Sequence, residues 1–247
     1  MSAAPVPPSD VSPSGADDRR ALVRQGLAIG VATGLYGTSF GAVAVAGGLD
    51  VWQACALSLL VFSGASQFAF VGVLAAGGSP WSGAATGLML GARNMLYGLG
   101  LVRLLRWRGL RRVGAAHLVI DESSAVATST TRPADARLGF LVTGGSIFVL
   151  WNLMTLVGAL AGTAIGDPRT YGLDAAVAAA FLALLWPRLG DRPAVAVAVV
   201  AAALALLLVP ATPAGVPVLA SASVALLAAL WPRRTPPGAD PAEEGAP

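Results

Sequence analysis

Four ionisable side chains lie inside stretches of this sequence that are otherwise apolar enough to span a membrane. They are Arg93, Asp121, Glu122 and Asp174. A charged group near the centre of a bilayer costs about 2.5–3.5 kcal/mol even on insertion scales with low penalties, so such groups usually face a polar cavity and act there. The four residues predict a polar pathway through a bundle of membrane helices, which is typical of a transporter.

Uncharged polar residues interrupt a second apolar run. Ser63, Ser66 and Gln67 lie within SGASQ, and Ser63 and Gln67 are four residues apart, which predicts one shared helix face. Gln67 has two donors and an acceptor that need partners in lipid. These residues either hold helices together or bind a solute, and the sequence leaves both interpretations open.

Arg93 and its neighbour Asn94 lie about ten residues into their apolar segment. An arginine does not lose its proton in a protein, so Arg93 needs an anion or water beside it. One interpretation is a structural ion pair with Asp121, Glu122 or Asp174. The other is a substrate carboxylate, bound through the planar guanidinium.

Asp121 and Glu122 are neighbours, so on a helix they point about 100° apart and cannot share a proton. One can pair with Arg93 while the other titrates, because a carboxyl group shielded from water holds its proton more readily. His117 lies four residues before Asp121, which predicts the same helix face, and could relay a proton. One histidine with two carboxylates is a poor set of metal ligands, and we expect no metal or other cofactor. Asp174 opens its segment, where it either caps a helix or joins this site.

The composition is typical of an integral membrane protein. Apolar residues make up 55% of the 247 residues and charged residues 12%, with a mean hydropathy of +0.71. A soluble domain has about 25% charged residues. The arginines lie mostly in connections rather than on one soluble face, so we expect a partner in the lipid bilayer and none in nucleic acid. No soluble-enzyme motif is present, and we expect no enzymatic activity.

The apolar stretches predict an all-α polytopic membrane protein with six to eight hydrophobic segments. The candidates are 25–47, 51–76, 83–105, 113–131, 138–166, 171–187, 192–209 and 213–231. They would form one transmembrane domain over 25–231. We expect disordered tails on both sides, a cytoplasmic one at 1–24 and another at 232–247.

The arginines constrain how the segments cross. If all eight cross the membrane, every basic connection lies on the cytoplasmic side except the largest, at 103–112. The conflict disappears if 25–47 and 113–131 are broken or re-entrant, as in many secondary transporters. The alternative is plain crossings with one violation of the rule. Gly37 lies in the glycine-rich part of the first segment, which is either a packing face or an unwound stretch that meets substrate.

Four motifs resemble a known family when they are taken in order. They are GLYGTSFGAVAVAGGL, LLVFSGASQFAFVGVL, LMLGARNMLYGLGL and LVIDESSAVA. They resemble the AzlC family of branched-chain amino acid exporters, over about residues 22–231. The resemblance implies a large permease subunit that exports valine, leucine and isoleucine and is coupled to protons. It also implies a small hydrophobic partner of the AzlD type and a multi-pass location in the bacterial inner membrane.

The residues and the resemblance together predict one site. Its substrate-binding residues would be Gly37, Ser63, Ser66, Gln67, Arg93 and Asn94, and its proton-coupling residues Asp121, Glu122 and His117. Arg93 and helix N-termini would hold the substrate carboxylate, while Asp121 or Glu122 would hold the ammonium or the proton. The region of Phe62, Phe68 and Met95 would accept the apolar side chain. Two alternatives stay open, a transporter of another small solute and a membrane scaffold subunit that transports nothing.

Overall fold

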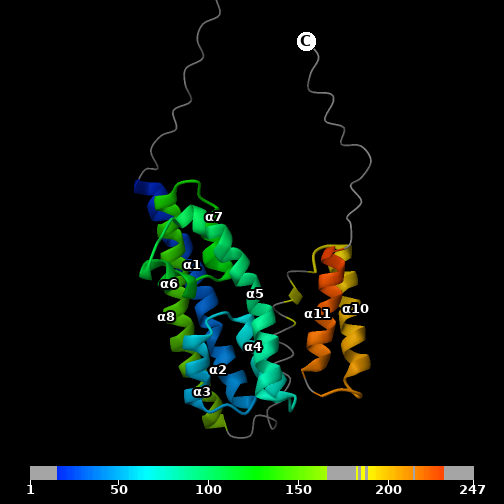
Figure 1. The fold of residues 1–247 in the computed structure, drawn as a ribbon. Helices are drawn as coiled ribbons and strands as arrows, with labels where there is room; N and C mark the ends of the chain where they lie inside the picture. Colours follow the sequence, from blue (N-terminus) through cyan, green and yellow to red (C-terminus); the bar gives the residue numbers. More distant parts are fainter. Residues whose placement is uncertain (1–15, 166–181, 183–184, 187–188, 214, 231–247) are drawn as a thin grey trace, which may run out of the picture. The chain divides into compact units, whose positions relative to one another are not determined.

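The computed structural model of the chain is helical, with no strand in the residues that it describes. These residues are 16–165, 182, 185–186, 189–213 and 215–230. The chain divides into two compact units, Met1–Leu184 and Leu185–Pro247. Figure 1 draws α1 to α8 of the first unit in blue to green, and α10 and α11 of the second in yellow to orange. The predicted all-α class is confirmed.

The first unit begins with a helical stretch that is divided only at Tyr36. Helices α1 (Ala16–Leu35) and α2 (Gly37–Ala46) flank this residue, whose own dihedral angles are helical at φ −65° and ψ −17°. The prediction that 25–47 is broken or re-entrant, with an unwound glycine stretch, is therefore wrong. Residues 16–24 of the expected N-terminal tail are also helical, and Arg19 Nε lies 3.1 Å from Asp135 Oδ1. The rest of both expected tails lies outside the described residues.

The glycines of this stretch keep their helical backbone because they pack against α8 (Pro133–Ile165). A Cβ added at Gly41 would overlap the carbonyl oxygen of Thr155, and one added at Gly158 would overlap that of Thr38. Gly37 takes part in the same contact, against the backbone of Trp151. Small residues let two helix backbones approach this closely, so the packing interpretation of the glycines is the one that the structure favours.

Two helical hairpins follow, and each turns back before it reaches the other end of the unit. They are α3 (Val51–Leu60) with α4 (Ala65–Ala75), and α6 (Leu110–His117) with α7 (Asp121–Thr128). We call residues 61–64 the first break and residues 118–120 the second break. Helix α5 (Pro80–Leu105) connects the hairpins. In Figure 1, α3–α4 enters from the end where α2 finishes and α6–α7 from the end where α1 begins.

The positions of the breaks correct the expected segments. Segment 113–131 is broken, as predicted. Segment 51–76 is broken as well, although its long apolar run predicts one continuous helix. The chain therefore turns back at 51–76 and 113–131, instead of at 25–47 and 113–131.

The arginine-rich connections of the first unit gather at one end. Arg137 Nε donates to Leu105 O at 2.7 Å, which joins the start of α8 to the end of α5, and Arg19 joins α1 to the same end. We call this the arginine-rich end. The opposite, arginine-poor end contains the connections 47–50 and 76–79, which have no arginine. With two segments turned back, 103–112 lies beside the other basic connections, and the orientation conflict disappears.

Two helical stretches, Asp17–Ala46 and Pro133–Ala164, are long and apolar enough to cross a membrane. Helix α5 is continuous over 26 residues, but the polar residues Arg93 and Asn94 interrupt its apolar sequence near the middle. The full count of six to eight segments therefore stays a prediction.

The second unit pairs α10 (Arg192–Leu208) with α11 (Val216–Leu230). Asp191 begins α10, where its carboxylate accepts from the backbone N–H of Ala194 at 2.7 Å. None of the side chains of α10 is buried in this unit. The single domain expected over 25–231 stays a prediction.

We predict that Gly41→Ala and Gly158→Ala each lower the free energy of unfolding by at least about 1–3 kcal/mol, because the new methyl group must displace backbone. The matched control is Gly145→Ala on the same helix α8, where an added Cβ meets nothing within 4 Å. This control is expected to be neutral or stabilising by about 0.5–1 kcal/mol. The apparent Tm in detergent is measured for all three variants. A loss of Tm in Gly145→Ala equal to that in the other two would contradict the packing assignment.

Candidate functional site

Gln67 holds the first break together. Gly64 has φ +52°, a conformation that favours glycine, and its backbone N–H donates to Gln67 Oε1 at 3.0 Å. Gln67 Nε2 donates to Leu57 O at 3.3 Å, so one fully buried side chain joins the end of α3 to the start of α4. Ser63 lies in the break and outside α4. The predicted helix face shared by Ser63 and Gln67 is therefore wrong.

Ser123 holds the second break together, as Gln67 holds the first. The backbone N–H of Ile120 donates to Ser123 Oγ at 3.1 Å, and Ser123 Oγ donates to Leu118 O at 2.6 Å. Both breaks thus begin their second helix with a backbone N–H that is satisfied by a side chain three residues later, which is half of a capping box.

His117 ends α6 before the second break, so it does not share a helix with Asp121 as predicted. Its Nε2 lies 2.9 Å from Leu59 O near the end of α3, and its ring packs against Phe62 and Phe148. His117 therefore joins the two hairpins to each other.

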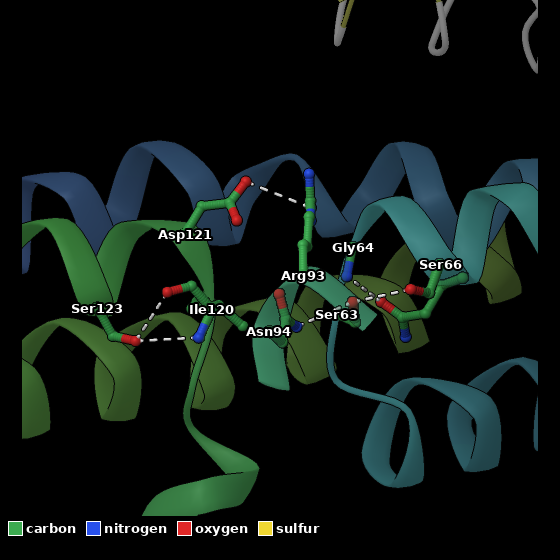
Figure 2. A network of polar contacts seen from close by, with 9 residues as sticks. Ser63, Gly64, Ser66, Arg93, Asn94, Ile120, Asp121 and Ser123 are labelled. Carbon is green, nitrogen blue, oxygen red and sulfur yellow. Dashed lines mark hydrogen bonds and ion pairs between the residues drawn. The ribbon is translucent and has the colours of Figure 1, made fainter. Parts of the chain in front are cut away.

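The middle of α5 contacts both breaks. Arg93 Nη2 lies 3.3 Å from Asp121 Oδ2 at the start of α7, and Asn94 Nδ2 donates to Ser63 Oγ at 3.2 Å. Ser63 Oγ in turn lies 2.9 Å from Ser66 Oγ in the first turn of α4. Figure 2 shows this row of contacts from Ser123 through Arg93 to Ser66. Two neighbouring residues of one helix thus each hold the tip of a different hairpin.

The two helix N-termini at this point differ in charge. The N-terminus of a helix carries about half a positive charge. Asp121 and Glu122 offset it in the first turn of α7, whereas the first turn of α4 contains no acidic residue. The site therefore presents an acidic tip on α7, beside Arg93, and a positive tip on α4, beside Asn94.

Several buried polar atoms around the site have no hydrogen-bond partner among the described residues. They include Arg93 Nε, Asn94 Oδ1 and Ser124 Oγ, and also Tyr36 Oη and Trp151 Nε1 in the neighbouring aromatic cluster. About nine in ten buried polar groups in proteins have a partner, ordered water included. These polar atoms are available to water or to a bound solute.

An aromatic cluster lies next to the first break. Phe68 packs against Tyr36, Phe40 and Trp151, with ring centroids 5.4–6.5 Å apart. Phe62 and Phe68 are buried in this core. Met95 is 72% exposed, so its predicted place beside them is wrong.

The structure brings together most of the residues that the sequence predicts. Ser63, Ser66, Gln67, Arg93, Asn94 and Asp121 form one connected group, and Glu122 follows in the first turn of α7. Gly37 lies in the contact with α8, and Asp174 lies outside the described residues. Gly64 and Ser123 also belong to this group, although the sequence patterns did not predict them as site residues. The signal for the first break was a helix start inside an apolar run, with Gly64 three residues before Gln67.

The family described as AzlC protein matches residues 28–165, which contain α5 and both breaks. The chain belongs to the AzlC family. The branched-chain amino acid transport protein AzlC of Bacillus subtilis (strain 168) is 24% identical over 161 residues, which cover 64% of this chain and 60% of that protein. The inner membrane protein YgaZ of Escherichia coli (strain K12) is 27% identical over 170 residues, 65% of each chain. The chain thus spans less than two thirds of these relatives. No solved structure matches it.

We predict that Gln67→Leu lowers the free energy of unfolding by about 1–3 kcal/mol, because it removes a fully buried side chain's bonds and leaves the partly buried Gly64 N–H without an acceptor. Gln53→Leu is the matched control. It removes the same kind of bond, to the Asp50 N–H, at the exposed start of α3, where water replaces it. The control is expected to change stability by less than about 0.5 kcal/mol. Apparent Tm in detergent compares the two, and a similar loss in both would contradict the role given to Gln67.

Proposed function

We propose that this chain is a membrane permease that exports branched-chain amino acids. The observation that carries the proposal is the Arg93–Asp121 pair, which lies at the N-terminus of α7 among apolar segments of an AzlC family member. The outer face of α5 is apolar on either side of this pair, with Met95, Leu96 and Leu99 each about 70% exposed. Such a face suits contact with lipid.

The charges of the two tips fit a zwitterion. A carboxylate would bind at the N-terminus of α4, which has no acid of its own, and at the guanidinium of Arg93. The ammonium would bind at the acidic tip of α7, on Asp121 or Glu122. A transported amino acid would then satisfy the unpaired atoms Arg93 Nε and Asn94 Oδ1.

The aromatic cluster supports the choice of side chain. Valine, leucine and isoleucine carry aliphatic groups, and the apolar cluster of Phe68 and Trp151 beside the first break would open to accept them. The Bacillus subtilis relative, whose printed name is branched-chain amino acid transport protein AzlC, supports the same substrate class.

Export would be driven by protons and would involve a second subunit. Protonation of Asp121 or Glu122 would weaken the hold on the ammonium, so that amino acid and proton exchange for one another at the tip of α7. A small hydrophobic subunit of the AzlD type would cover apolar surface of this chain in the membrane. The arginine-rich end would face the cytoplasm.

This orientation makes a prediction for cysteine labelling in a Cys55→Ala background. An impermeant maleimide should label Trp52→Cys and Ala76→Cys in intact cells, because both positions lie at the arginine-poor end. It should label Arg108→Cys and Thr131→Cys only after lysis. Labelling of Trp52→Cys and Ala76→Cys from opposite sides would show that segment 51–76 crosses the membrane and does not turn back.

A second prediction concerns transport itself. We expect Arg93→Ala and Asp121→Asn to lower valine counterflow in proteoliposomes more than about tenfold, because a bond to a charged group contributes about 1.5–3 kcal/mol. The control is Arg103→Ala, an exposed arginine on the same helix, which should keep wild-type exchange.

The counterflow assay should include valine, leucine, isoleucine, alanine and a plain carboxylate, each with and without the small subunit and at two pH values. Exchange of the branched-chain amino acids above the others supports the substrate assignment. Normal valine exchange in both site variants would refute the proposed site, and exchange of the carboxylate alone would identify a different solute.

A further inference from the structure

The two hairpins approach the middle of α5 from opposite ends of the first unit (Figure 1). Arg93 holds Asp121 at the tip of α6–α7, and Asn94 holds Ser63 at the tip of α3–α4 (Figure 2). Neighbouring residues on a helix point about 100° apart. The two contacts therefore use different faces of α5, and one can break while the other stays intact.

The two halves of the unit have the same plan with opposite direction. A long helical stretch, α1–α2 or α5, is followed by a hairpin whose second helix starts at the centre of the unit. The first backbone N–H of that helix is satisfied by Gln67 in one half and by Ser123 in the other. Inverted arrangements of this kind are typical of secondary transporters, in which one site opens to each side in turn.

We propose that the Arg93–Asp121 and Asn94–Ser63 contacts are the latches of two separate gates. Release of Asp121 would free the tip of α6–α7 and open the site toward the arginine-rich end. Release of Ser63 would free the first break and the end of α3, and open the site toward the arginine-poor end. The proposal rests on the proposed function as a transporter.

The packing of the hairpins decides which parts move. Helix α4 lies close to α5, since a Cβ added at Gly87 would be 3.1 Å from Ser66 O. The movement at the arginine-poor side therefore belongs to the first break and α3, while α4 stays on α5. Helix α7 lies close to α8 in the same way, since a Cβ added at Gly139 would be 2.8 Å from Val126 Cγ1, so the movement at the arginine-rich side belongs to the second break and α6. The contact between His117 Nε2 and Leu59 O ties α3 to α6, so this contact must break when either hairpin moves.

The test measures from which side a buried cysteine can be reached. The reporter is Ser124→Cys in a Cys55→Ala background, because Ser124 is 7% exposed and its Oγ has no partner among the described residues. An impermeant maleimide is added to right-side-out and to inside-out vesicles. Ala76→Cys and Thr131→Cys, measured separately, identify the end that each vesicle type exposes.

We expect Asp121→Asn to raise the labelling rate of the reporter about tenfold from the arginine-rich end, with no change from the other end. Ser63→Ala should raise it about fivefold from the arginine-poor end alone, since a bond between neutral groups contributes less than one to a charge. Arg93→Gln and Asn94→Ala remove the other partner of each latch and should reproduce these two patterns. Unfolding would raise labelling from both ends in every variant.

Labelling that increases from the same end in both classes of variant, or from neither end, would overturn the proposal. Because the labelling needs no substrate, its outcome is separate from that of the transport assay. If the two classes of variant open from opposite sides but valine is not exchanged, the two gates are supported and the assignment of valine as substrate is refuted. If valine is exchanged but labelling changes from one side only or not at all, the transport function is supported and the latches are refuted.

Discussion

A backbone N–H or C=O in an apolar surrounding needs a partner, and the two breaks of this chain depend on that requirement. Each break frees backbone groups that would cost several kcal/mol if they were left without hydrogen bonds in lipid. Gln67 and Ser123 satisfy the N–H of the last residue of each break, and each also bonds to a carbonyl, Leu57 O before the first break and Leu118 O at the start of the second. The breaks can therefore lie in the middle of apolar segments, and the polar ends of four short helices meet there.

The rest of the first unit supports this arrangement. Glycines bring α1 and α2 against α8 at the distance of backbone contact, which builds a tightly packed pair of long helical stretches. Helix α5 lies between the hairpins and contributes Arg93 and Asn94, which contact one tip each. Glycines of α8 also bring α7 and the second break close to that helix, since a Cβ added at Gly144 would be 3.2 Å from Leu118 O.

The sequence predicted the members of the site better than their arrangement. The polar types of Ser63, Arg93, Asn94 and Asp121 in apolar runs were enough to single them out, because charge and hydrogen-bonding groups are costly in lipid. The helical spacings that joined Ser63 to Gln67 and His117 to Asp121 were wrong, since a break lies between the members of each pair. Spacing predicts a shared face only where the helix is continuous.

The sequence by itself determined the all-α class, the apolar segments, the polar residues of the site and a conflict at 103–112 that turned-back segments would resolve. Tertiary structure decided which segments turn back. Glycines in 25–47 weaken an isolated helix, but packing against α8 keeps that stretch helical. The apolar run of 51–76 favours a continuous helix, but Gln67 satisfies the backbone of a break there. Both outcomes depend on contacts between residues distant from the local pattern, and local propensity does not contain them.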